Sequence, residues 1–310
     1  MEIYDRTLYN LSRVSFKGGG MKQFLRSIGF SMYKKKGEIK ELLDQIQSEH
    51  IAAARIVITP EKERYWEIRF MVNQILGLCL FGNLDNISHF NREGYFPYIQ
   101  SNLISSSSNV SLQMNLDDTT FSGLVDDNRV GISLIFRINN NLEILDAMGE
   151  SRVPKAITLG AFSTEGKVLL PIQKTEEQIL RINSLNNTRS QLIEAAKNGD
   201  ESAMDSLSTE DMLLYSTISR RMTKDDMYSI IDNLFMPFGM ESDMYTIIGE
   251  ILDFSFLKNQ FTQEESVLLQ IKCNDILLLV AMARGDLQGE PQIGRRFKGN
   301  IWMQGTIHFS

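Results

Sequence analysis

The chain of 310 residues is poor in the side chains that carry most metal and nucleophile chemistry, with only three His and two Cys. No His lies three or four residues from another His or from a Cys, so the spacing of a usual zinc site is missing. Cys79 and Cys273 lie far apart, each inside an apolar run, and we expect two buried free thiols rather than a disulfide. The sequence therefore predicts no cofactor.

Long apolar runs are missing as well. The longest of them, Ile276–Ala283, is far shorter than the roughly 20 residues that a membrane helix needs. Polar residues such as Asp5, Asn10 and Arg13 interrupt the N-terminal segment, so we expect no secretory signal. With 43% hydrophobic and 23% charged residues, the sequence is typical of a globular protein of about two domains. The expected location is the cytoplasm, with no membrane partner.

Charge is unevenly distributed along the chain. Residues 1–40 carry nine Lys/Arg and three Asp/Glu, a net charge of +6, which leaves −13 for the remainder of a chain whose net charge is −7. An acidic body disfavours general affinity for nucleic acid or anionic membranes. The basic run Lys34-Lys35-Lys36 could bind an anion, although such runs are commonly solvated loops before a helix.

The sequence changes character at Met21, directly after Lys17 and three glycines. Upstream there is no sustained apolar pattern, and downstream a dense amphipathic pattern begins. Two interpretations of residues 1–20 stay open. They are an extension that the native protein does not contain, or an N-terminal arm on a flexible glycine tether. Expression from Met21 with unchanged stability would show that residues 1–20 are dispensable, and a large loss of stability would make them part of the fold.

Periodicity divides the rest of the chain into three parts. In residues 21–173 we expect two short helices, at 22–33 and 38–49, followed by strands joined by tight polar turns. The expected strands are 65–72, 75–81, 110–116, 121–125, 132–138, 142–145, 157–162 and 168–172. Such runs predict an antiparallel meander rather than a parallel sheet, and so an α+β domain.

The two following parts differ in composition. Residues 174–224 are expected to form a helical connector, with Asp200 capping a helix after Asn198-Gly199. Residues 225–310 return to β structure, with strands expected at 244–256, 265–272, 276–282 and 297–309. Glycines in the last of these permit tight bends, so we expect a small, five-stranded barrel, by analogy with the oligonucleotide/oligosaccharide-binding fold.

The most suggestive candidate site lies in the segment RRFKGNIW, in which cations alternate with aromatic residues. On a small barrel, that combination is typical of proteins that bind single-stranded nucleic acid. The candidate binding residues are Arg295, Arg296, Lys298 and Trp302. Against this, alternation puts Phe297 and Ile301 on the face opposite Lys298 and Trp302. Since one face must be core, one aromatic is left for a surface rather than a stacking platform.

A second candidate site consists of two acidic doublets that could meet around a divalent cation. They are Asp117, Asp118, Asp126 and Asp127. Calcium loops place carboxylates and glycine in a fixed order that is absent here, so turn residues are the simpler interpretation.

Four segments, MKQFLRSIGF, LIEAAKNGD, MPFG-x4-MYTIIGEI and IGRRFKGNIWMQG, together resemble an uncharacterised domain-of-unknown-function family of clostridia-like Gram-positive bacteria. The resemblance spans the chain from Met21 to Phe309, and members of the family begin at the equivalent of Met21. It implies no activity, substrate or catalytic residue.

Three functions are compatible with these patterns. The first is a non-catalytic, cytoplasmic adaptor that binds a protein or a small ligand. The second is an accessory protein that binds single-stranded nucleic acid through the C-terminal barrel. The third is a hydrolase that depends on the acidic doublets and a divalent metal. The scarcity of His and the missing nucleophile motifs favour the first.

Overall fold

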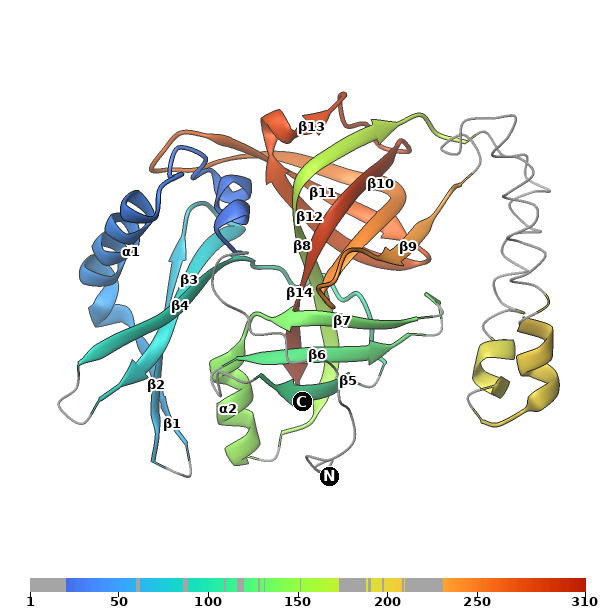
Figure 1. The fold of residues 1–310 in the computed structure, drawn as a ribbon, viewed down its shortest axis with the longest axis horizontal. Coiled ribbons are helices and arrows are strands. Elements are labelled where there is room, and N and C mark those ends of the chain that lie inside the picture. The colour runs from blue at the N-terminus through green and yellow to red at the C-terminus, as the bar shows by residue number, and fades with distance from the viewer. Residues whose placement is uncertain are drawn as a thin grey trace.

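Figure 1 shows the computed structural model of the chain, in which two β-sheets dominate an α+β fold. The structure describes residues 21–59, 62–85, 89–108, 110–115, 120–127, 129–130, 132–150, 152–172, 188, 191–196, 198–207, 209 and 231–310. The predicted α+β class is confirmed for this part of the chain.

The smaller sheet contains four antiparallel strands in the order β1-β2-β3-β4. Their bounds are β1 Arg55–Ile58, β2 Arg64–Met71, β3 Leu76–Leu84 and β4 Phe90–Ile99. The period-two pattern of β2 puts Trp66, Ile68 and Phe70 on one face, where all three are buried. The strands predicted at 65–72 and 75–81 are therefore confirmed.

Two helical segments pack on this sheet and share a core with it. The 3₁₀-helix η1, Met21–Ile28, and the helix α1, Lys36–His50, contribute Phe24, Leu25, Ile39 and Leu43, among others. A short 3₁₀ turn, η2 Ile51–Ala53, leads from α1 into β1. The helix expected at 22–33 ends early, because Gly29 adopts φ +83° and reverses the chain.

The larger sheet contains ten strands in the order β13-β8-β12-β11-β10-β14-β7-β6-β5, with β9 added to β10. Their bounds are β5 Val110–Met114, β6 Phe121–Asp126, β7 Ser133–Ile138, β8 Pro154–Leu169, β9 Leu234–Pro237, β10 Met244–Lys258, β11 Glu265–Cys273, β12 Ile276–Ala283, β13 Leu287–Gln288 and β14 Arg296–Phe309. The helix α2, Asn141–Glu150, follows β7, and the 3₁₀ turn η4, Arg284–Asp286, precedes β13.

The larger sheet is mixed, which corrects the expectation of a purely antiparallel arrangement. Strand β8 runs parallel to β12 and β13, and β14 runs parallel to β7. Strand β8 also pairs antiparallel with β14 along most of its length. The pairings therefore run in a ring, from β8 through β12, β11, β10 and β14 back to β8.

Three of the predicted strands differ from the structure for identifiable reasons. Residues 142–145, expected as β, lie in α2, because the preceding asparagines anchor the start of a helix there. Residues 157–162 and 168–172 are predicted as two strands joined by a tight polar turn, but 154–169 form the single strand β8. Gly166 is a packing position rather than a turn residue, since a Cβ there would lie 2.5 Å from the Phe297 ring.

The fold has two hydrophobic cores, one on each face of β14. Phe297, Ile301 and Met303 point into a core formed mainly by the larger sheet and α2, to which Val57 of β1 and Tyr65 of β2 also contribute. Trp302 points the other way, into a core that the larger sheet shares with η1, α1 and the smaller sheet. Both faces of the last strand are thus buried, and the two sheets are joined by apolar contacts.

The predicted helical connector is described only in part. Residues 191–196 and 201–207 are helical, and Asp200 Oδ1 accepts hydrogen bonds from the N–H groups of Ser202 and Ala203, as a helix cap should. Most of residues 173–230 lie outside the described part of the chain. Among the helices that are described, none is long and apolar enough to cross a bilayer.

Candidate functional site: a polar junction between the two sheets

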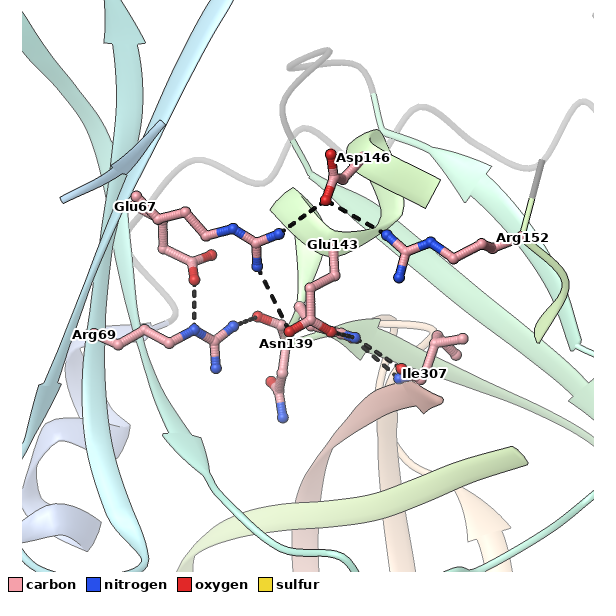
Figure 2. Close-up of polar contacts among 9 residues, drawn as sticks. Glu67, Arg69, Asn139, Glu143, Asp146, Arg152 and Ile307 are labelled. Carbon is pink, nitrogen blue, oxygen red and sulfur yellow. Dashed lines mark hydrogen bonds and ion pairs between the residues drawn. The ribbon is translucent and has the colours of Figure 1, made fainter. Parts of the chain in front are cut away.

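A cluster of charged and amide side chains lies where β1 and β2 of the smaller sheet face β7 of the larger sheet and the helix α2 that follows it (Figure 2). We call this cluster the polar junction. Its members are Arg55, Glu67, Arg69, Asn139, Asn140, Glu143, Asp146 and Arg152.

The centre of the polar junction is Arg69. Alternation along β2 puts Glu67 and Arg69 on the face opposite Trp66 and Ile68, toward the larger sheet. Arg69 Nε donates to the Glu67 carboxylate, Nη2 donates to the Asn139 carbonyl oxygen at 2.7 Å, and the guanidinium carbon lies 4.9 Å from the centre of the Tyr98 ring. These three contacts fix the plane of the guanidinium group.

Burial and charge act in opposite directions on Arg69. Burial alone would lower its pKa, but the neighbouring Glu67 carboxylate raises the pKa above the usual value for arginine. The Glu67 side chain is 5% exposed, whereas that of Arg69 is 35% exposed. The buried Glu67 carboxylate thus holds a permanently charged guanidinium group that remains partly exposed to solvent.

Three consecutive asparagines tie the polar junction to the larger sheet. Asn140 Nδ2 donates to the Ile307 carbonyl oxygen at 2.8 Å and to Glu143 at 2.7 Å, and its Oδ1 accepts from the Ile307 N–H at 3.0 Å. Asn141 Oδ1 accepts from the Phe121 N–H at 2.9 Å. The asparagines that the sequence presents as a loop are therefore buried connections between β14, β6 and α2.

The outer part of the polar junction consists of exposed ion pairs. Arg55 on β1 lies 3.1 Å from Asp146 and 3.7 Å from Glu143, and Arg152 lies 3.4 Å from Asp146 (Figure 2). Each of these side chains is 34–46% exposed. Such pairs contribute little to stability individually, and those of Arg55 connect β1 with α2.

A buried thiol adjoins the polar junction. Cys79 on β3 lies opposite Arg69 in the register of β2 and β3 and is fully buried. Burial raises the pKa of Cys79 well above its ordinary value, and the Glu67 carboxylate raises it further. Since the thiolate is the nucleophilic form, this environment suits a structural cysteine rather than a reactive one.

The structure places the predicted barrel residues in different environments. Arg296 is 5% exposed and donates to the carbonyl oxygens of Leu170 at 2.9 Å and Ile231 at 2.5 Å. Arg295, directly before β14, and Lys298 on β14 are half-buried. Burial lowers the pKa of Arg296.

Trp302, the aromatic member of that set, is 3% exposed. Its Nε1 donates to Asp243 Oδ2 at 2.8 Å, and its ring stacks on Phe24 with 5.0 Å between ring centres. Trp302 thus fills the core between the two sheets. Alternation in the sequence correctly puts Trp302 and Phe297 on opposite faces of β14. It carries no signal that the smaller sheet covers the face with Trp302.

Of the two acidic doublets, only Asp126 and Asp127 lie in the described part of the chain. Asp117 and Asp118 lie outside the described residues. Asp126 accepts a hydrogen bond from the Ser133 hydroxyl group, and the buried Asp127 accepts from Ser106 Oγ at 2.6 Å and from Arg129 Nε at 2.8 Å. Within the part of the chain that the structure describes, no three His, Cys, Asp or Glu residues are grouped so that they could hold a metal ion.

The Asp127 contacts predict a pH dependence of stability. Burial alone would raise the pKa of Asp127, but the hydrogen bonds from Arg129 and Ser106 outweigh it and lower the pKa to about 2, against 3.8 for a free side chain. A depressed pKa stabilises the fold above about pH 4, and the stabilisation is lost as the pH falls toward 2. Asp127→Asn should therefore lower the free energy of unfolding by about 2 kcal/mol at pH 7.

Urea unfolding at pH 7, 4 and 2.5 measures this effect, with the exposed neighbour Asp126→Asn as the matched control. The difference between wild type and Asp127→Asn should shrink between pH 4 and 2.5. An unchanged difference across that range would contradict the assignment.

Comparison with known proteins gives one match. A family model described as "Domain of unknown function, E. rectale Gene description (DUF3881)" matches residues 25–305. Neither a search of curated proteins nor a search of solved structures returned a match.

Proposed function

Because the chain belongs to the domain-of-unknown-function family DUF3881, which assigns no activity, we propose from the polar junction that it is a non-catalytic, cytoplasmic binding protein. The observation that carries the proposal is the presentation of Arg69. Its guanidinium group is fixed by Glu67, Tyr98 and the Asn139 carbonyl oxygen while a third of the side chain stays exposed.

The chemistry of Arg69 favours a carboxylate as ligand. A guanidinium group has five N–H donors in a planar fork, and the contacts to Glu67 and Asn139 use one on Nε and one on Nη2. The others can pair with the two oxygens of a carboxylate in a bidentate arrangement. The contacts that fix the plane reduce the ordering cost of binding, which is the advantage of a preorganised group.

Titration with an acetylated tetraglutamate peptide tests the proposal. Arg69→Lys keeps the positive charge beside Glu67 but removes the fork, and it should weaken binding about tenfold. The matched control is Arg284→Lys, because Arg284 also contacts a carboxylate, that of Glu290, and lies 4.9 Å from the Phe256 ring, but outside the polar junction. Equal affinity of the two variants, or no binding by wild type, would contradict the proposal.

Single-stranded nucleic acid remains a second candidate ligand, through Arg295, Arg296, Lys298 and Trp302. It is favoured by one observation, that Lys167 on β8 lies directly opposite Lys298 on β14. Adjacent lysines attract phosphates, whereas the buried Trp302 ring gives no stacking surface at that point. A dT15 oligonucleotide in the same titration distinguishes the ligands, since binding to phosphates must weaken steeply with salt.

We also propose that β8, β10, β11, β12 and β14 form a small closed barrel. The support is their ring of pairings, of which the β8–β12 pair is parallel and the other four are antiparallel. Strand β10 pairs first with β14 and then with β11, and an irregularity between Ile251 and Asp253 marks the bend. The proposed barrel takes four strands from residues 225–310 and one from residues 21–173.

A further inference from the structure

The hairpin between β9 and β10 carries an unusual concentration of exposed apolar side chains. Met236, Phe238 and Met240 are 52%, 43% and 97% exposed and lie within five residues of one another. The Phe238 N–H donates to the Met244 carbonyl oxygen at 2.9 Å, and Gly239 with φ +73° makes the reversal possible. Single exposed apolar residues are ordinary, but three on one hairpin indicate an interaction surface.

The base of the hairpin is firmly attached to the core. Phe235 is buried and packs edge-to-face on Tyr245, with 5.2 Å between ring centres. Asp243 accepts the hydrogen bond of Trp302 Nε1, and its carbonyl oxygen accepts from the Met303 N–H at 2.8 Å. The exposed tip is therefore presented by an anchored element, so that little order has to be gained when a partner binds.

The charge of this region selects the chemistry of the partner. Residues 232–257 contain five Asp or Glu residues and no Lys or Arg. Asp243 is buried, and Glu250 lies opposite Arg296 and Lys272 in the register of β10, so the exposed carboxylate of the hairpin itself is that of Glu241. An apolar tip with this exposed carboxylate beside it is complementary to a segment that has an apolar face and basic flanks.

We propose that the β9–β10 hairpin is a docking site for a basic amphipathic helix of a partner protein. Methionine side chains are flexible and polarisable, and they adapt to the apolar face of such a helix, while Glu241 pairs with its basic residues. An anionic membrane surface would be repelled by the Glu241 carboxylate. This site lies on a different element from the polar junction and does not depend on the function proposed for Arg69.

The test uses the full chain and two labelled peptides of identical composition. One is a 14-residue Leu/Lys peptide patterned as an amphipathic helix, and the other is a scrambled version of it. In fluorescence anisotropy at about 0.15 M salt, which screens long-range charge, the patterned peptide should bind at least about tenfold more tightly than the scrambled one. Met240→Ser and Phe238→Ser should each remove most of that difference, and Glu241→Lys should weaken binding of the patterned peptide.

The matched control is Ile293→Ser, which removes another exposed apolar side chain, 68% exposed, outside the hairpin. It should bind the patterned peptide like wild type, and all four variants should keep the wild-type unfolding midpoint because the altered side chains are exposed. Equal binding of the two peptides, or equal losses in Ile293→Ser and Met240→Ser, would overturn the proposal. A wild-type dimer in sedimentation that Met240→Ser abolishes would overturn it too, since the occupant would then be a second copy of the chain.

Discussion

Replacing Trp302 by alanine is expected to lower the free energy of unfolding by about 4 kcal/mol. The ring is 3% exposed, stacks on Phe24 from η1 and lies near Phe162 from β8, with 6.3 Å between ring centres. Its removal leaves a cavity between the two sheets. It also removes the only N–H that the tryptophan side chain offers to the buried Asp243 carboxylate, whose pKa is already raised by burial.

Urea unfolding of Trp302→Ala and Trp302→Phe separates the two contributions. Phenylalanine keeps most of the ring volume and loses the N–H, so it should cost about 1–2 kcal/mol. Adding Asp243→Asn to Trp302→Phe removes the uncompensated charge and should recover part of that loss. If Trp302→Ala instead kept wild-type stability and lost binding to the dT15 oligonucleotide, the ring would be the surface aromatic that the sequence pattern suggests.

The burial of Trp302 shows which part of the fold could be predicted from sequence and which could not. Period-two alternation identified β2, and β-rich runs between turn signals identified β7, β10, β11, β12 and β14, all at nearly their observed bounds. Alternation reports that a strand has two faces, but it cannot report what covers each of them. Because the smaller sheet covers the outer face of β14, the residue predicted as a binding aromatic is part of the core.

The polar junction was beyond sequence reasoning for a related reason. Glu67 and Arg69 alternate with buried apolar residues on β2, which is also the pattern of a strand with a solvated face. Asn139, their partner, follows them by about 70 residues in a run that resembles a turn. A weak signal was available, since three consecutive asparagines exceed what a tight turn needs, and buried amides commonly connect elements through hydrogen bonds.

Replacing Asn140, the middle one of these three asparagines, should also lower the free energy of unfolding strongly. Asn140→Ala leaves the N–H and carbonyl oxygen of Ile307 without the partners they have in the fold, and Glu143 without one of its own. Asn140 is 2% exposed, so water does not replace these hydrogen bonds without rearrangement. The expected loss of unfolding free energy is about 2–4 kcal/mol, which is the penalty for two or three buried, unsatisfied polar groups reduced by local relaxation.

Urea unfolding measures the Asn140 effect, with Asn91→Ala, an exposed asparagine on β4, as the matched control at no more than about 0.5 kcal/mol. Hydrogen exchange locates it, since the Ile307 amide should exchange faster in Asn140→Ala. Asn140→Asp should be nearly as destabilising, because a carboxylate oxygen would replace the Nδ2 donor opposite the Ile307 carbonyl oxygen. A loss below about 1 kcal/mol with an unchanged Ile307 amide would mean that the exposed ion pairs of Arg55 and Arg152 hold α2 in place, contrary to their expected small contribution.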